Sequence, residues 1–208
     1  MESITQFAER ANRLTNQGIE AGLVKPYESE LIEKLRNFYY MGIPASILLS
    51  TREMCDGHCE RRAMLISMGM EVFTLVFGNI KSLEVQFGIE GAEHWWVEKD
   101  EWVYDTSKGY KVKKELYYEI EQPVIKKVFS KQDCLAWPEY QEILTSDIEE
   151  DKSMTPFTLP ILEHYVPTSF FPKWLEAEIK RFKQQIGYDA LYQEVLDDML
   201  AKGFKMTS

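Results

Sequence analysis

Apolar positions recur at helical spacing in the first fifth of the chain. Residues 2–17 predict an amphipathic helix, with one apolar face formed by Ile4, Phe7, Ala8, Ala11 and Leu14. Gly18 is its expected end. A second helical pattern follows Pro26 and is broken at residues 42–44, with apolar positions at Tyr27, Leu31, Leu35, Phe38 and Tyr39.

Residues 58–70 are apolar on nearly every side of the expected helix. A helix of this kind is usually buried in the middle of a domain. Asp56 or Gly57 is placed to cap its beginning. Cys59 therefore falls in or beside the first turn, where the partial positive charge of a helix start favours a thiolate over a thiol.

After Gly69 the pattern changes to strands rich in β-branched and aromatic residues. Strands are expected at residues 72–77, 83–87, 95–97 and 102–104, with Gly78-Asn79 as a turn and residues 98–101 as a hairpin turn. Residues 117–129 offer one or two more, interrupted by Pro123. The fold class that follows is α+β, in which a buried helix carrying a cysteine packs on an antiparallel sheet.

The C-terminal half predicts a loop followed by helices. Residues 145–160 are polar and contain two prolines, which favours a loop or lid. Two apolar stripes, separated by Gly187, then predict helices after Pro172. Residues 1–208 are expected to form a single domain, with N-terminal helices (1–50), a helix-plus-sheet core (51–130), a loop or lid region (131–170) and C-terminal helices (171–203).

Composition narrows the classes of function. The net charge of -10 argues against nucleic-acid and anionic-membrane binding. There is no apolar run near the roughly 20 residues needed to cross a bilayer, and the first residues predict no secretory signal. Three cysteines, two of them four residues apart, favour a reducing, cytoplasmic compartment over a disulfide framework. Nothing in the sequence indicates a cofactor.

Cys59, His94 and Asp105 supply the parts that thiol catalysis needs. A nucleophilic thiol requires a proton acceptor within hydrogen-bond reach, and a carboxylate on the other imidazole nitrogen orients that acceptor. His94 and Asp105 are separated by a short turn, so paired strands of one hairpin would project both side chains from one face. Taken singly, each of the three residues is more typical of an ordinary core or surface position. Taken together, their order along the chain and the residues that flank them favour an active site.

Other groups offer alternatives. Cys55 is a rival nucleophile, and Cys134 and His164 show no partner in the sequence. Cys55, His58 and Cys59, with His94, form one irregular cluster, whereas structural zinc sites normally pair two ordered knuckles; no metal is therefore expected. An oxyanion hole would use the backbone N–H of Cys59, and a side-chain donor among Ser50, Thr51 and Arg52 stays unassigned.

Three tryptophans near the predicted site are candidate substrate-binding residues: Trp95, Trp96 and Trp102. Neighbouring residues of a strand point to opposite faces. Of Trp95 and Trp96, one is therefore expected to line a groove beside His94, while the other packs in the core.

Three segments together resemble the transglutaminase-like superfamily: Gly57-His58-Cys59 through Ala63, His94-Trp95-Trp96-Val97-Glu98, and Trp102-Val103-Tyr104-Asp105-Thr106. The resemblance covers about residues 50–110. It implies a papain-like core with the cysteine on a buried helix and the histidine and aspartate on adjacent strands. The chain departs from many members in having Thr106 directly after Asp105, and in Arg61-Arg62.

The superfamily's activities are what the resemblance implies for function. Members include cross-linking transglutaminases, cysteine proteases and amidases, and peptide N-glycanases. The expectation is a cysteine hydrolase acting on a peptide or protein amide bond through an acyl-enzyme. An acyltransferase with the same triad is the alternative, as is a non-catalytic interaction module that keeps the fold. The Arg-Gly-Gly-x-Cys type motif of arylamine acetyltransferases is absent.

Overall fold

The structure, a computed structural model, describes residues 2–40, 42–48, 59–145 and 172–204, with side chains from residue 176 onwards in the last range. Its helices are α1 (Ile4–Glu20), α2 (Ser29–Leu35), α3 (Ala45–Leu48), α4 (Cys59–Met68), α5 (Lys81–Phe87), α6 (Lys114–Glu121), α7 (Lys131–Leu135), α8 (Pro138–Thr145), α11 (Pro172–Ile186) and α12 (Tyr188–Ala201). Its strands are β1 (Val24–Lys25), β2 (Tyr39–Tyr40), β3 (Ile43–Pro44), β4 (Thr74–Asn79), β5 (Glu93–Lys99), β6 (Trp102–Asp105), β7 (Tyr110–Lys113) and β8 (Val124–Ser130).

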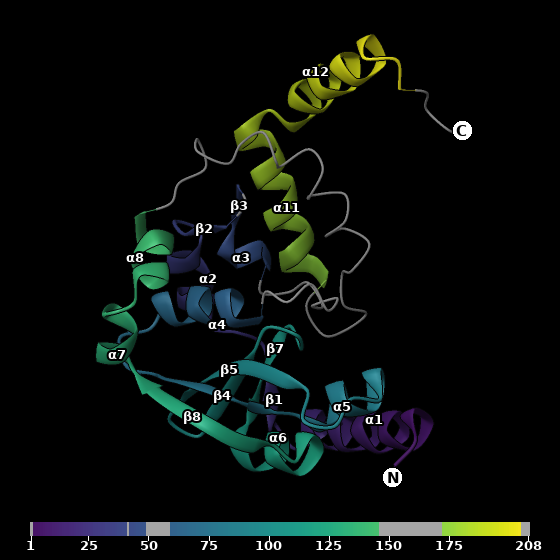
Figure 1. Ribbon diagram of the computed structural model, residues 1–208, viewed down its shortest axis with the longest axis vertical. Coiled ribbons are helices and arrows are strands. Elements are labelled where there is room, and N and C mark those ends of the chain that lie inside the picture. Colours follow the sequence, from purple (N-terminus) through teal and green to yellow (C-terminus); the bar gives the residue numbers. More distant parts are fainter. Residues whose placement is uncertain (1, 41, 49–58, 146–171, 205–208) are drawn as a thin grey trace.

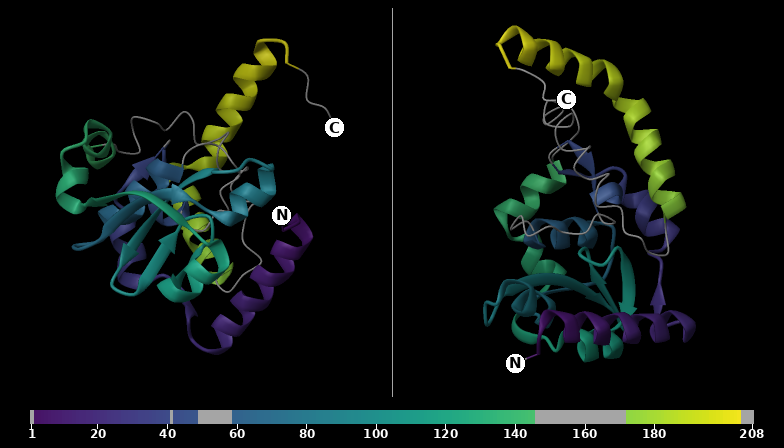
Figure 2. Two further views of the ribbon diagram at one scale, coloured as in Figure 1. Left: turned by 60° about the horizontal axis from the view of Figure 1, so that its bottom comes forward. Right: turned by 90° about the vertical axis from the view of Figure 1, so that its right-hand side faces the viewer.

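A six-stranded antiparallel sheet forms the centre, in the order β1-β7-β6-β5-β4-β8. Helix α4 lies on one face of the sheet, and α1 and α6 lie on the other (Figure 1). The same layering is visible from the side, where α11 and α12 extend beyond the face that α4 covers (Figure 2). The α+β class and the antiparallel sheet predicted from the sequence are therefore confirmed.

Successive side chains of each strand point to opposite faces of the sheet and so contribute to two hydrophobic cores, one on each face. Leu75, Val97 and Tyr104 face α4 and its neighbours, whereas Val76, Trp96 and Val103 face α1 and α6. The residues of α4 from Arg62 to Ser67 are all buried. The prediction of a buried central helix followed by strands is thus confirmed.

Helix α1 runs past its expected end at Gly18. A Cβ at this position would lie 2.3 Å from Leu116 Cδ2 of α6 and 3.0 Å from Val24 Cγ2, so a larger residue would force these side chains to shift. The helix begins with a capping box between Ser3 and Gln6. Gly18 is therefore a packing residue, and the prediction that it stops the helix is wrong.

Two predicted strands are helices instead. Residues 83–87 lie in α5, which packs on α1 and α6. Residues 117–121 belong to α6, where Leu116, Tyr117 and Ile120 are buried at helical spacing. Tertiary contacts with α1 outweigh the strand preference of these β-branched and aromatic residues. Only the later part of the expected 117–129 region is a strand, namely β8.

The segment expected to be a loop or lid begins with regular structure. Residues 131–145 form α7 and α8, of which α7 begins with a capping box formed by Ser130 and Asp133. The remainder of the predicted loop, from residue 146 to residue 170, lies outside the described residues. The C-terminal helices are found where expected, with Gly187 in a left-handed conformation between them (φ 64°).

Candidate active site

His94 is held near the beginning of β5 by a close approach of two strands. It lies opposite Gly78 of β4. A Cβ on Gly78 would lie 2.5 Å from the Val124 carbonyl oxygen and 3.0 Å from Trp96 Cη2, so glycine is required where β4, β5 and β8 meet. The His94 side chain is 1% exposed, and its ring stacks on Trp96 with ring centroids 6.5 Å apart.

Asp105 ends β6 and contacts His94 directly. The distance from His94 Nε2 to Asp105 Oδ1 is 3.0 Å, and both side chains are 1% exposed. The β5–β6 hairpin pairs Val97 with Tyr104, which places His94 and Asp105 on the same face of the sheet. The predicted meeting of these two side chains is therefore confirmed.

Three further hydrogen bonds hold the Asp105 carboxylate. Ser107 donates to Oδ1 from its backbone N–H (2.9 Å) and from its hydroxyl (2.7 Å). Tyr117 of α6 donates its hydroxyl to Oδ2 at 2.8 Å. The Tyr27 hydroxyl donates to the Asp105 carbonyl oxygen at 3.1 Å. The carboxylate is thus bonded on both oxygens and fixed in orientation.

The charge state of Asp105 follows from these contacts. Burial alone raises the pKa of a carboxyl group, but the nearby charges of His94 and Lys108 and the hydrogen bonds from His94 and Ser107 outweigh it and hold the pKa of Asp105 well below its usual range. Asp105 is therefore ionised at neutral pH and can only accept hydrogen bonds. His94 Nε2 consequently carries a hydrogen, and in the neutral ring Nδ1 is the proton acceptor.

The tyrosines around Asp105 stay protonated. Burial, and then the charge of Asp105, raise the pKa of Tyr27 and of Tyr117 well above the usual value. Both hydroxyls therefore remain hydrogen-bond donors throughout the physiological pH range.

Cys59 is the first residue of α4 and is partly exposed. Helix α4 packs on β5. Residues 69–73 join its far end to the start of β4, so that end lies near Thr74 and its cross-strand partner Glu98. The beginning of α4 accordingly lies toward the end of β5 that carries His94, but α4 covers the face of the sheet opposite to the one that His94 shares with Trp96 (Figure 1).

The second described cysteine has a different environment. Cys134 is fully buried in the core. Burial and the neighbouring charge of Asp133 raise the pKa of its thiol to about 11. Cys134 therefore stays a protonated, inaccessible thiol at neutral pH, as expected of a packing residue.

The three tryptophans have separate surroundings. Trp96 is fully buried and donates from Nε1 to Glu98 at 3.1 Å. Trp95 points to the opposite face, where its ring packs against Phe77, Phe129 and Trp137. The predicted division between the two faces is confirmed, with Trp96 as the core residue. A role of Trp95 in substrate binding stays a prediction.

Trp102 begins β6, whereas Asp105 ends it. The ammonium groups of Lys25, Lys111 and Lys113 lie 5.4, 4.6 and 4.8 Å from its ring centroid, which is cation–π geometry. The Trp102 side chain also packs against the hydrophobic core on the α4 side of the sheet. Its substrate-binding role likewise stays a prediction.

Several predicted candidates lie outside the described residues: Ser50, Thr51, Arg52, Cys55, His58 and His164. Within the described ranges, no cluster of three or more His, Cys, Asp or Glu side chains is arranged to hold a metal ion. No helix in the same ranges is long and apolar enough to span a membrane.

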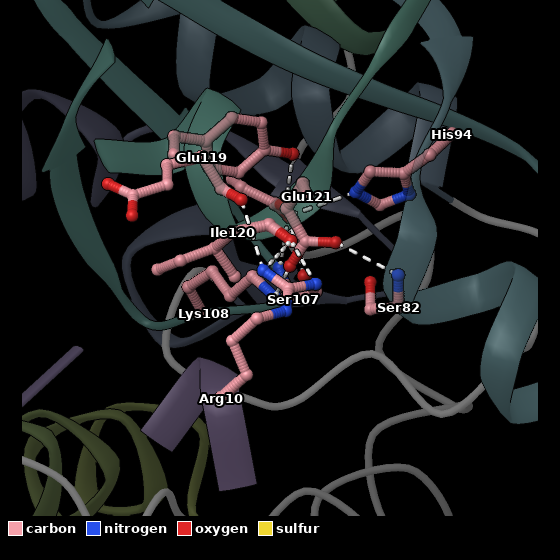
Figure 3. Close-up of polar contacts among 10 residues, drawn as sticks. Arg10, Ser82, His94, Ser107, Lys108, Glu119, Ile120 and Glu121 are labelled. Carbon is pink, nitrogen blue, oxygen red and sulfur yellow. Dashed lines mark hydrogen bonds and ion pairs between the residues drawn. The ribbon is translucent and has the colours of Figure 1, made fainter. Parts of the chain in front are cut away.

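Sequence reasoning missed the residues that support Asp105. The contact of Ser107 with Asp105 could have been predicted from the sequence, because an aspartate side chain commonly accepts a hydrogen bond from the backbone N–H two residues later. Tyr117 had none, since its position depends on α6 packing against the sheet. Lys108, whose charge acts on Asp105, and its ion-pair partner Glu121 (Figure 3) were likewise not identified as members of the site.

No protein-family model, curated protein or solved structure matches the chain.

Proposed function

We propose that the chain is a transglutaminase-like cysteine hydrolase, of protease or amidase type, that acts on a peptide or protein amide bond through Cys59, His94 and Asp105. The observation that carries the proposal is the buried His94–Asp105 pair, with a carboxylate bonded on both oxygens. A bonded, ionised carboxylate on one imidazole nitrogen is what a histidine base requires. A helix that begins with Cys59 and packs on an antiparallel sheet is the order of elements that the proposal requires.

The proposed reaction has two stages. His94 Nδ1 accepts the proton of Cys59, and the thiolate attacks the amide carbonyl carbon, forming a C–S bond. The C–N bond then breaks, and the amine leaves with the proton from His94. Water next gives a proton to His94 and its oxygen to the carbonyl carbon, the C–S bond breaks, and Cys59 takes back a proton as the acid is released. Asp105 stabilises the imidazolium at each stage.

The exposure of the groups suits this division of roles. His94 and Asp105 are 1% exposed and shielded from solvent, which strengthens their interaction. Cys59 retains partial exposure, as a nucleophile that must meet a substrate requires. The backbone N–H of Cys59, at the beginning of α4, is one candidate donor to the oxyanion.

An ester acylation assay tests the proposal. The protein is incubated with p-nitrophenyl acetate, and the acetylated residue is identified by intact-mass and peptide mass spectrometry. Transient acetylation of Cys59 that is lost in Cys59→Ala and strongly slowed in His94→Ala is the expected result. Cys134, buried and with a raised thiol pKa, is the internal control and stays unmodified.

The same assay separates the alternatives. Adding glycinamide to the acetylated protein distinguishes acceptors: release of acetate indicates a hydrolase, whereas release of acetylglycinamide indicates an acyltransferase. No acetylation of Cys59 above the rate seen in His94→Ala would contradict the catalytic proposal and favour an interaction module.

A further inference from the structure

A second ion pair, between the half-buried Lys108 and the buried Glu121, lies beside the His94–Asp105 pair. Glu121 ends α6 and is fully buried. Its Oε1 accepts from Lys108 Nζ at 2.5 Å, and its Oε2 accepts from the Ser82 backbone N–H at 3.0 Å (Figure 3). Glu121 is therefore a carboxylate with both oxygens bonded, away from solvent.

Lys108 connects this pair to Asp105. It stands three residues after Asp105, and its backbone N–H donates to the Asp105 carbonyl oxygen at 3.0 Å, which closes the turn between β6 and β7. Burial lowers the pKa of the Lys108 ammonium group, but the charges of Glu121 and then Asp105 outweigh it and raise the pKa above the usual value. Lys108 is thus a permanent positive charge between two buried carboxylates.

The net charge of the side chains around His94 depends on Glu121. Asp105 and Glu121 contribute two negative charges and Lys108 one positive charge. With His94 neutral, this group of side chains carries one excess negative charge, which favours a proton on the imidazole. Without Glu121, the Lys108 charge would cancel that of Asp105, and the imidazole would lose this support.

We propose that Glu121 is a positioning residue of the candidate active site, which neutralises Lys108 and thereby keeps the buried surroundings of His94 favourable to the imidazolium. The proposal rests on the proposed function and deepens it, because in that function the His94 imidazolium stabilises the Cys59 thiolate. Its own content, the effect of Glu121 on His94, holds whether or not the chain is an enzyme.

The other side chains named in this region do not supply the negative charge that Glu121 contributes. Tyr117 of α6 and Tyr27, ahead of α2, remain neutral donors to Asp105. Arg10 of α1 is matched by Glu2, with its Nε 2.9 Å from Glu2 Oε1. Cys59 begins α4, which covers the opposite face of the sheet (Figure 1).

Arg10 also holds the end of helix α6, which carries Glu121, in place. Its guanidinium donates to the carbonyl oxygens of Glu119 and Ile120 at 3.1 and 3.2 Å, at the last turn of α6 (Figure 3). A cation at a helix C-terminus is stabilising. The end of α6, and with it the Glu121 carboxylate, is therefore anchored from α1.

The test is an NMR titration of the His94 ring nitrogens. It is carried out in the Cys59→Ala background, so that thiol ionisation does not couple to the imidazole. The chain has three histidines, and loss of one signal set in His94→Gln assigns the resonance. Glu121→Gln is the test variant, and Glu119→Gln, which removes an exposed carboxylate two residues away, is the matched control.

The expected result is a protonation midpoint of His94 lower by about one pH unit in Glu121→Gln, as for loss of one charge in partly buried surroundings. Glu119→Gln is expected to leave the midpoint unchanged. Lys108→Met is expected to raise it, and Lys108→Met/Glu121→Gln to return it close to the parent value, because the double substitution restores the balance.

Equal midpoints in Glu121→Gln and Glu119→Gln would overturn the proposal. If Glu121→Gln does not fold, the Lys108→Met and double variants decide the matter, and a Lys108→Met midpoint that does not rise is contradictory. Acylation of Cys59 is measured separately, so a failed acylation with these shifts intact would contradict the proposed function alone.

Discussion

The substitution Tyr117→Phe removes one hydrogen bond to Asp105 and keeps the aromatic ring. The Tyr117 side chain is 1% exposed, and its hydroxyl donates to Asp105 Oδ2 at 2.8 Å. Phenylalanine keeps the ring and its packing against Trp96, at a centroid distance of 5.9 Å. The substitution therefore isolates the contribution of one donor to a buried carboxylate.

The magnitude follows from the charge of the acceptor. A hydrogen bond to a charged group contributes about 1.5–3 kcal/mol, and a buried oxygen that loses its donor is not rehydrated. We expect the free energy of unfolding at pH 7 to fall by about 2 kcal/mol. His94 and Ser107 still bond Oδ1, so the fold is retained.

The loss should depend on pH. The pKa of Asp105 in the folded protein lies below its value of about 3.9 in unfolded chains. A group of this kind stabilises the fold above the unfolded pKa, and that contribution is lost as pH falls through the folded pKa. The Tyr117→Phe deficit should thus be constant from pH 7 down to about pH 4 and shrink only at lower pH, as the Asp105 carboxyl group of the folded protein becomes protonated.

Urea denaturation followed by tryptophan fluorescence at several pH values measures the deficit. Tyr192→Phe, which removes a hydroxyl from a side chain that is 42% exposed, is the control and should leave the free energy of unfolding unchanged. A deficit at pH 7 no larger than that of the control, or one that already shrinks between about pH 7 and pH 5, would refute the reasoning.

Three further predictions concern packing, a buried ion pair and thiol chemistry. Gly18→Ala should lower the free energy of unfolding by about 1–3 kcal/mol, measured by urea denaturation, because its Cβ would clash with Leu116; an unchanged value would contradict the close packing of α1 on α6. Glu178→Gln should lower the free energy of unfolding by about 1–2 kcal/mol in the same assay, since a side chain that is 2% exposed accepts from both Arg36 and Arg181; an unchanged value would contradict a stabilising role of these ion pairs. Cys134 should resist iodoacetamide in folded protein at pH 7 and react only after denaturation, as read by mass spectrometry; rapid labelling of the native protein would contradict its burial.

The parts of the fold that sequence predicted best are those with a strong local period. The buried helix α4, the β5–β6 hairpin and the His94–Asp105 contact follow from apolar periodicity and from the two-residue repeat of strands. The hairpin turn is shorter than expected, and Asp100 adopts a left-handed conformation there (φ 55°). Aspartate tolerates that conformation better than most residues do.

The parts that sequence could not predict depend on contacts between distant segments. Helix α5 and the end of α6 carry residues with strand preference, yet packing against α1 decides their structure. Tyr117 and Glu121 reach the site only because α6 is helical. Because residues 117–121 were predicted to be strand, the sequence did not indicate that Tyr117 and Glu121 lie near Asp105.

The most direct test of the account is whether His94 controls the reactivity of Cys59. Site-resolved alkylation with iodoacetamide is followed by mass spectrometry at several pH values, in the native protein and in His94→Ala and Asp105→Asn. The account predicts that Cys59 reacts faster than any other cysteine at pH 7 and that both substitutions slow it. If Cys59 is no faster than the other cysteines, or if His94→Ala leaves its rate unchanged, the thiol and the buried pair do not form one site, and the catalytic proposal is contradicted.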